Sequence, residues 1–448
     1  MLVTALWLGS AAAAADNIAL LLPLGIIGGL PIGVTLWKSA RRAPWALTVL
    51  LVATVVLLSI SFREREVGTA GLDGQSGLKF AVWLAILGLA ALNVPRLVKL
   101  LADPVMMALA CYTTVAILST IYSPVPVVTA SGAMGILAYG LFAGLLAESL
   151  TPRTIILALL LSLAALMVGN HIFGWLNPDV AYVAVDPEGS PGVYRFRGFS
   201  GHPNTLGRQS TVFALVIFAA AYMRYIKPVI WVPLAALAVT TTLATESRTS
   251  LFALVLAVMF QIRGRYLVPM LGFGALIAII TLLTGGVDTI LSMVGRDGSV
   301  SEAETMSGRT DIWHFATGLI GERPLTGYGF NSFEAYASTL WTGPKESATE
   351  THNNFISILY STGLIGAVPF FAIMGLMLYR WIVSPFPPRD AFVVNVLFTS
   401  FSETDMPTNI TPVPTMIFFI FIAIDAYSRL TRLQRVFDAA PHGEMQWT

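Results

Sequence analysis

The sequence predicts an all-α polytopic membrane protein with about 12–14 transmembrane helices and a large external loop that carries short helices. Hydrophobic residues make up 56% of the 448 positions and charged residues only 11%, and the mean hydropathy is +0.75. A soluble protein of this size has about twice that charged fraction. No polar stretch is long enough to form a soluble domain of its own, so we expect a single helical bundle in the membrane.

Apolar segments of membrane-spanning length recur along the whole chain. An α-helix needs about 20 residues to cross the hydrocarbon core of a bilayer. The segment before Asn17 has no basic residue at its start, so we expect it to belong to the first membrane hairpin rather than to a cleaved signal peptide. The predicted spans are 17–37, 43–60, 80–94, 105–122, 133–150, 155–175, 210–223, 229–244, 250–260, 266–283, 355–379, 391–401 and 412–426.

The basic residues predict which helix ends face the cytoplasm, because Lys and Arg collect in the cytoplasmic turns of membrane proteins. When strict alternation is counted from Lys38, more than half of the 26 Lys and Arg residues fall on one side. These residues are Lys38, Arg41, Arg42, Arg96, Lys99, Arg153, Arg224, Lys227, Arg263, Arg265, Arg380, Arg389, Arg429, Arg432 and Arg435. We therefore predict a multi-pass protein of the bacterial inner (cytoplasmic) membrane whose long loops and active site face the periplasm.

Two long loops interrupt the row of helices and define the organisation of the chain. Both are rich in glycine, proline and polar residues, and long loops on a rigid scaffold commonly carry function. The second loop is acidic overall, so a phosphate site within it must use a few chosen arginines. The predicted parts are N-terminal transmembrane helices (1–175), a first long periplasmic loop (176–208), central transmembrane helices (209–284), a large periplasmic loop (285–352), C-terminal transmembrane helices (353–428) and a cytoplasmic tail (429–448).

Several common kinds of site are missing from the sequence. It contains one cysteine, Cys111, so neither an intrachain disulfide nor a metal–thiolate cluster can form. It has no Walker loop, no dinucleotide fingerprint and no His-Glu-x-x-His motif. The external turn Glu403-Thr404-Asp405 has two carboxylates that could hold a cation, but no further ligand accompanies them. We therefore interpret this turn as solvated.

Arginines stand where the external loops meet the membrane. Arg195 and Arg197 precede a turn rich in glycine and proline, where they either grip phosphate oxygens or anchor the helix at the lipid headgroups. Glu246 and Arg248 occupy a short external turn, as a functional pair or as a local ion pair. Arg309 precedes an aromatic amphipathic segment, which suits either an anion site at a helix start or an interfacial anchor.

A histidine stands where the large loop re-enters the membrane. His352 is followed by two asparagines, and histidine is the side chain best suited to move a proton near neutral pH. A capping or packing role is the alternative, and His202 and His314 compete on equal chemical grounds. The loops therefore offer arginines for an anion and a histidine for proton transfer.

The order of these motifs resembles the O-antigen ligase superfamily, which also includes O-antigen (Wzy-type) and exopolysaccharide polymerases. The resemblance covers roughly residues 195–366, and the first half of the chain matches only as a row of membrane helices. The ordered set is specific to the superfamily but does not separate its branches. The matching motifs are Arg197-Gly198, His202-Pro203-Asn204 with Gly207, Ser247-Arg248, Ser307-Gly308-Arg309 with Trp313, Gly327-Tyr328-Gly329-Phe330, His352-Asn353 and Gly363-Leu364-Ile365-Gly366.

The resemblance implies a GT-C-like glycosyltransferase whose donor is a glycan on undecaprenyl pyrophosphate, with no nucleotide sugar, cofactor or metal ion. It implies that Arg248 and Arg309 bind the donor pyrophosphate, that Arg197 is a further loop arginine of the site, and that His352 acts at the acceptor hydroxyl. Arginines that strengthen their contacts as charge develops on the leaving group would speed its departure. A single displacement inverts the anomeric configuration, and no dedicated carboxylate nucleophile is evident.

The acceptor distinguishes the two main hypotheses for function. A polymerase transfers the growing chain to the next saccharide unit, whereas a ligase transfers it to the lipid A core, and the arginine-bearing external loops favour the polymerase. A lipid-linked sugar transporter or flippase is the third hypothesis, but transporters usually place charged residues at mid-membrane. The expected partners are the lipid-linked donor, a saccharide or lipid A core acceptor and membrane lipids, with no nucleic acid.

Overall fold

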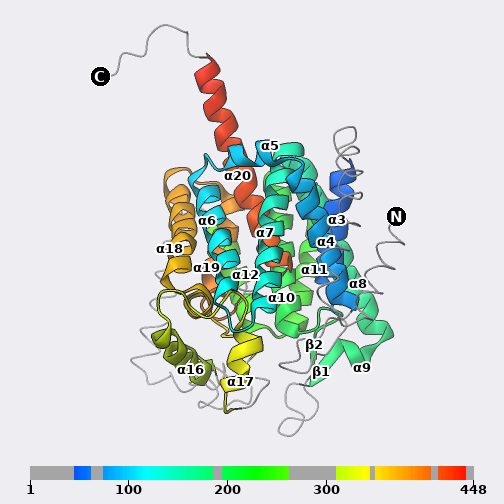
Figure 1. Ribbon diagram of the computed structural model, residues 1–448. Coiled ribbons are helices and arrows are strands. Elements are labelled where there is room, and N and C mark those ends of the chain that lie inside the picture. Colours follow the sequence, from blue (N-terminus) through cyan, green and yellow to red (C-terminus); the bar gives the residue numbers. More distant parts are fainter. Residues whose placement is uncertain are drawn as a thin grey trace, which may run out of the picture.

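The computed structural model describes residues 45–61, 74–184, 194–261, 309–343, 349–404 and 412–439. Most of these residues are helical, and one short antiparallel hairpin is the exception among them. The long helices lie side by side in a bundle, with α9, β1, β2, α16 and α17 at one end and the C-terminal helix α20 projecting from the other (Figure 1). The predicted all-α polytopic fold is confirmed.

The elements before the large loop begin repeatedly at a proline, which suits the first turn of a helix because it has no N–H to satisfy. At α6 the side chain of Asp103 also caps the helix, accepting from Val105 N at 2.9 Å. The elements are α3 (Trp45–Ser59), α4 (Gly74–Ala91), α5 (Val94–Leu100), α6 (Pro104–Leu118), the 3-10 turn η1 (Ser119–Ile121), α7 (Pro126–Ser149), α8 (Pro152–Leu176), α9 (Pro178–Ala181), β1 (Tyr182–Ala184), β2 (Tyr194–Phe196), α10 (Pro203–Tyr222), α11 (Pro228–Ala244) and α12 (Arg248–Gln261).

The later elements form a small cap over the bundle and then return to it. Residues 309–343, which we call the loop cap, contain helices and turns that pack around a second, smaller hydrophobic core. The elements are α16 (Arg309–Glu322), the π-helical turn η2 (Phe333–Ala337), α17 (Ser338–Leu340), α18 (Asn354–Val383), α19 (Pro387–Thr399) and α20 (Pro412–Ala439).

Within the described residues, five helices are long and apolar enough to span a membrane, or six if the bent pair α4–α5 counts as one span. Every predicted span outside residues 1–44 and 262–308 coincides with a helix. The predicted spans 17–37 and 266–283 lie outside the described residues, so the total of about 12–14 helices stays a prediction. Helix α10 is long enough to span but carries buried polar side chains in its first turns, including Arg208 and Gln209.

A buried ion-pair network holds together the end of the bundle from which α20 projects (Figure 1). Arg380 in α18 donates to Asp103 at the start of α6 (2.5 Å) and to Asp425 in α20 (2.9 Å). Arg389 at the start of α19 donates to Asp425 (3.1 Å) and Asp390 (2.5 Å). Removing one partner of a buried ion pair leaves an uncompensated charge and is strongly destabilising, so these pairs hold the four helices together. Both arginines belong to the set that the sequence predicts as cytoplasmic.

Helix α18 is interrupted at Gly363, whose φ is +59°. The loop that follows α16 docks into this break and bonds to both sides of it. Tyr328 N donates to Tyr360 O (2.8 Å), and Leu364 N donates to Pro324 O (2.9 Å). Backbone groups freed inside a membrane protein need partners within the protein, and the loop supplies them. Two glycine motifs that are distant in the sequence therefore form one unit, which attaches the loop cap to the bundle.

We expect Gly363→Ala to lower the free energy of unfolding by about 2 kcal/mol or more. Its backbone, with φ +59° and ψ −162°, lies in a region that is essentially restricted to glycine and costs other residues about 1–3 kcal/mol. The added Cβ would also lie 2.3 Å from the backbone of Leu325. Gly375→Ala in the same helix is the matched control, because a Cβ there meets nothing within 4 Å and alanine favours helix. Thermal unfolding in detergent measures both variants. A wild-type melting temperature for Gly363→Ala would show that the break does not depend on glycine.

Candidate functional site

Charged side chains from several loop segments meet at the end of the bundle that carries the loop cap. They come from the strand β2, the first turns of α10, the start of α16, the segment before α18 and the turn after α19. Hydrogen bonds and ion pairs connect five of them around Glu403 and three of them around Glu350. The two sets meet where Glu403 lies beside Glu350 and His352, within 4.8 Å between ligand atoms. We call this group the charged cluster: Arg195, Asn204, Arg208, Arg309, Glu350, His352, Glu403 and Thr404.

Glu403 is the centre of the charged cluster and is only 1% exposed. Arg208 Nη1 lies 3.1 Å from its Oε2, and Arg309 Nη2 lies 3.2 Å from its Oε1. Asn204 Nδ2 also donates to Oε1, at 3.3 Å. A buried carboxylate is costly unless it is paired and hydrogen-bonded, and these three groups satisfy it. Glu403 therefore holds a guanidinium from α10 beside a guanidinium from α16.

The interpretation of the Glu403 turn as solvated is wrong, because its carboxylate is buried against two arginines. The sequence gives no local signal for this pairing. Arg208 precedes Glu403 by 195 positions and stands just before a predicted span, where it reads as an ordinary loop residue. Asp405, the second acid of the turn, lies outside the described residues.

The two arginines of the first loop, Arg195 and Arg197, donate hydrogen bonds to different parts of the structure. Arg195 is 5% exposed, and it donates from Nε to Thr245 O (3.0 Å) and from Nη2 to Asn204 Oδ1 (2.6 Å). Arg197 donates from Nε to Val180 O (2.8 Å), in the segment that leads into β1. These contacts place Arg195 in the charged cluster and tie Arg197 to the base of the hairpin.

Arg248 is the first residue of α12 and is exposed at the same end of the bundle. The neighbouring residue, Thr249, shows what lies beside Arg248, because Thr249 Oγ1 accepts from the Ser402 hydroxyl (3.2 Å). The backbone carbonyl of Ser402 in turn accepts from Arg309 Nη1. The turn after α19 thus lies between the starts of α12 and α16, and Arg248 stands at the edge of the charged cluster.

His352 occupies a tightly held turn with a φ of +48°. Trp313 Nε1 donates to Thr351 O on one side of it (2.8 Å). On the other side, Asn353 caps α18 by accepting from Phe355 N (3.0 Å). A left-handed backbone outside glycine persists where the surrounding structure over-determines it, and such residues cluster at functional sites. Asn353 thus caps α18 and at the same time fixes the backbone next to the His352 imidazole.

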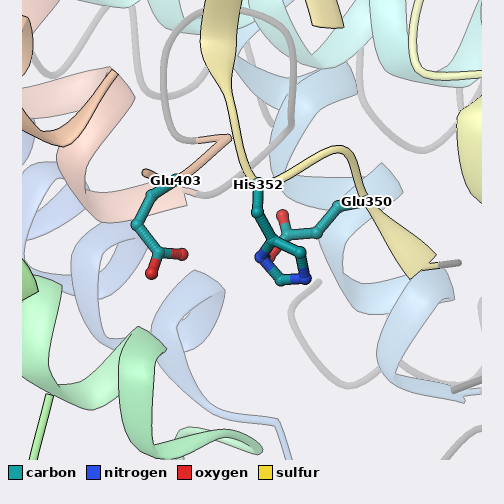
Figure 2. Close-up of side chains that lie close together, drawn as sticks. All are labelled: Glu350, His352 and Glu403. Carbon is teal, nitrogen blue, oxygen red and sulfur yellow. The ribbon is translucent and has the colours of Figure 1, made fainter. Parts of the chain in front are cut away.

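Glu350 lies against the imidazole of His352, with Oε1 at 3.1 Å from Nδ1, and its Oε2 accepts from the Thr404 hydroxyl. Desolvation opposes ionisation of Glu350. The contact with His352, the charge of Arg208 and the hydrogen bond from Thr404 outweigh it and hold the pKa of Glu350 below its ordinary value. Figure 2 shows Glu350 beside the imidazole, with Glu403 reaching the site from a different part of the chain.

The two competing histidines differ from His352 in their surroundings. His202 caps α10, its Nδ1 accepting from Asn204 N (3.1 Å). Part of its ring is open to solvent, yet desolvation and the charge of Arg195 lower its pKa to about 4, so it is neutral at neutral pH. His314 is exposed on α16. Of the three candidates, His352 is the one that lies at ion-pair distance from a carboxylate.

One ligand atom each from Glu350, His352 and Glu403 lie within 4.8 Å of one another, a spacing that a divalent cation could use. The surroundings oppose a cation, since both oxygens of Glu403 already accept from Arg208 and Arg309. The same guanidinium groups favour an anion with several oxygens, which they can bind in bidentate fashion. The arrangement therefore suits a phosphate-bearing ligand beside a carboxylate–imidazole pair.

Parts of this chain are similar in sequence to a known protein family and to a known protein. Residues 233–371 match the family described as O-Antigen ligase, and this segment contains Arg248, Arg309 and His352. The chain is also similar to the Exopolysaccharide production protein ExoQ of Rhizobium meliloti (strain 1021), with 25% identity over 280 residues. That match covers 57% of this chain and 61% of ExoQ, so it spans less than two thirds of the relative.

Proposed function

Because the chain carries an O-antigen ligase family domain in a polytopic membrane fold, we propose that it is an inverting glycosyltransferase of the bacterial inner membrane. It transfers a glycan from undecaprenyl pyrophosphate to a saccharide hydroxyl at the periplasmic face. The observation that carries this proposal is the charged cluster, in which arginines from two helices stand beside the Glu350–His352 pair.

In this proposal Arg309 and Arg248 bind the donor pyrophosphate, and Arg197 contributes from the first loop. The bond that breaks joins the anomeric carbon to a phosphate oxygen, and its electron pair leaves with the pyrophosphate. Guanidinium groups that tighten on those oxygens as charge develops lower the barrier. Glu403 holds Arg208 and Arg309 close together by pairing with both. The arginines supply the positive charge, so the proposed reaction uses no metal ion or other cofactor.

His352 acts on the acceptor in this proposal. It takes the proton of the attacking hydroxyl while the oxygen bonds to the anomeric carbon, a step that general bases typically accelerate about 10²–10⁴-fold. Attack on the face opposite the departing pyrophosphate inverts the configuration.

We favour a polysaccharide polymerase over a ligase that uses the lipid A core. The printed name of the relative ExoQ refers to exopolysaccharide production, which supports a polymeric product, whereas the description of the matched family keeps the ligase as the alternative. A transporter or flippase is less consistent with the structure, because the segments that carry the charged cluster, such as the starts of α10 and α16, lie at one end of the bundle and not at its middle (Figure 1). The basic residues Arg380 and Arg389 at the opposite end favour a periplasmic site.

The function is tested with purified protein in detergent and an undecaprenyl-pyrophosphate-linked repeat unit, with and without a lipid A core acceptor and without added metal. Products are separated on a gel. A ladder from the donor alone establishes a polymerase. Product that needs the core acceptor establishes a ligase, and no product with either acceptor favours the transporter hypothesis.

We expect Arg248→Lys to lower kcat/KM by about 10–100-fold, because a lost charge-assisted hydrogen bond costs about 1.5–3 kcal/mol and lysine cannot make a bidentate phosphate contact. Initial rates in the gel assay measure the effect. Arg153→Lys is the control, since Arg153 lies at the opposite end with its guanidinium 5.9 Å from the Tyr225 ring. Turnover of Arg248→Lys at the wild-type rate would exclude bidentate binding by Arg248.

A further inference from the structure

Two carboxylates border His352, and they serve different partners. Glu403 faces Arg208 and Arg309 with its two oxygens. Glu350 instead faces Nδ1 of His352 with one oxygen and accepts from the Thr404 hydroxyl with the other. Figure 2 shows the two carboxylates approaching the imidazole from separate segments. The site therefore has an arginine half, in which Glu403 pairs with Arg208 and Arg309, and a histidine half, in which Glu350 contacts His352 and Thr404.

We infer that Glu350 is a positioning residue whose carboxylate keeps Nδ1 of His352 protonated and turned inward, so that Nε2 faces the acceptor hydroxyl. This inference rests on the proposed function and deepens it on the acceptor side. Glu350 touches no reacting atom and acts through the imidazole.

The backbone at His352 is held on both sides. Thr351 is held by the Trp313 indole, and Asn353 is held as the cap of α18 and by a bond from its Nδ2 to Phe401 O (3.2 Å). With both neighbours fixed, the remaining freedom is rotation of the side chain. Nδ1 is buried, has no hydrogen-bond partner among the described residues and lies 3.1 Å from Glu350 Oε1. Glu350 is therefore the group beside this nitrogen that can orient the ring, as a carboxylate commonly does for a catalytic histidine.

The turn after α19 connects the two halves of the site. Ser402 and Glu403 contact Arg309 through a backbone carbonyl and a carboxylate. The next residue, Thr404, donates to Glu350. Three consecutive residues thus set the position of the imidazole relative to the arginine pair. Misplacement of a reacting group by about 1 Å can cost about 100-fold in rate, so this connection matters to turnover.

The proton balance of the transfer step gives Glu350 a clear role. The acceptor O–H gives its proton to Nε2, the new C–O bond forms, and the old bond leaves its electron pair on the pyrophosphate. The imidazole becomes positively charged beside an ionised carboxylate, which stabilises it. The lowered pKa of Glu350 keeps that carboxylate from taking the ring proton. The imidazolium then returns its proton to solvent.

The tautomer is tested directly by nitrogen NMR of protein labelled at its five histidines, because protonated and unprotonated ring nitrogens have different shifts. Loss of a signal in His352→Asn assigns it. Over a pH series, the neutral ring of His352 is expected to retain its proton on Nδ1. In Glu350→Gln the Nε2–H tautomer should become populated, and in Glu350→Asp the Nδ1–H form should recover in part.

Turnover supplies the second readout. We expect Glu350→Gln to lower kcat by about 100-fold, the lower end of what general-base catalysis contributes, with little change in the KM for the donor. Glu350→Asp should restore part of kcat, because it keeps the charge. Asp311→Asn is the matched control, since it removes one acidic charge from an exposed position at the same end of the bundle.

An Nε2–H neutral ring in the wild-type protein overturns the inference whatever the turnover. So does wild-type kcat in Glu350→Gln, or a raised KM with unchanged kcat. If the wild-type protein shows the Nδ1–H ring but makes no product from lipid-linked glycans, the proposed function fails while the positioning role of Glu350 stands.

Discussion

Arg309→Ala is expected to reduce kcat/KM by about 1,000-fold or more, because single donors that stabilise developing negative charge are worth about 10²–10³-fold and arginine supplies several. The variant should still fold. Glu403 keeps Arg208 and Asn204 as partners when the Arg309 side chain is removed. Initial rates in the gel assay and thermal unfolding in detergent separate a chemical defect from a structural one.

The control for Arg309 is Arg323→Ala, which removes an arginine from the same loop cap. Arg323 lies 4.7 Å from the centroid of the Tyr328 ring and is outside the charged cluster, so its loss should leave turnover close to wild type. Turnover of Arg309→Ala at the wild-type rate would remove Arg309 from the site.

His352→Asn is expected to lower kcat by about 10²–10⁴-fold, the usual contribution of a general base. Asparagine is the replacement of choice because, like histidine, it tolerates the left-handed backbone at φ +48°. Binding of the lipid-linked donor should persist, since the arginine half of the site is untouched. Single-turnover rates and donor binding by the purified protein measure the two effects.

His314→Asn makes the same substitution on the exposed face of α16 and should leave both quantities unchanged. If His352→Asn turns over normally, then His352 has only a structural role in the turn before α18, and the acceptor must lose its proton to another group.

The helices could be predicted from the sequence because their causes are local. Apolar segments near membrane-spanning length, with a proline or a capping residue such as Asp103 at the start, set most of their bounds. The hairpin of β1 and β2 was missed, because strands of three residues are too short to show an alternating pattern. Its pairing of Tyr182 with Phe196 brings Arg195 to the site.

The candidate site could be predicted only in part, because contacts between distant segments leave no local pattern. The resemblance pointed to Arg309 and His352, and the structure brings both into one charged cluster. Arg208 and Glu403 were missed, since each looks ordinary until the fold buries it against the other. The roles proposed for Arg248 and Arg197 stay predictions.

The break in α18 also gives a way to measure how firmly the loop cap is attached to the bundle. The amides of Leu364 and Ile365 donate to carbonyls of the docked loop and not to their own helix. These amides are protected from exchange with solvent while the loop stays in the break, so their exchange rates report how often the loop leaves it. A lipid-linked substrate whose binding stabilises the docked loop would slow exchange at these two amides.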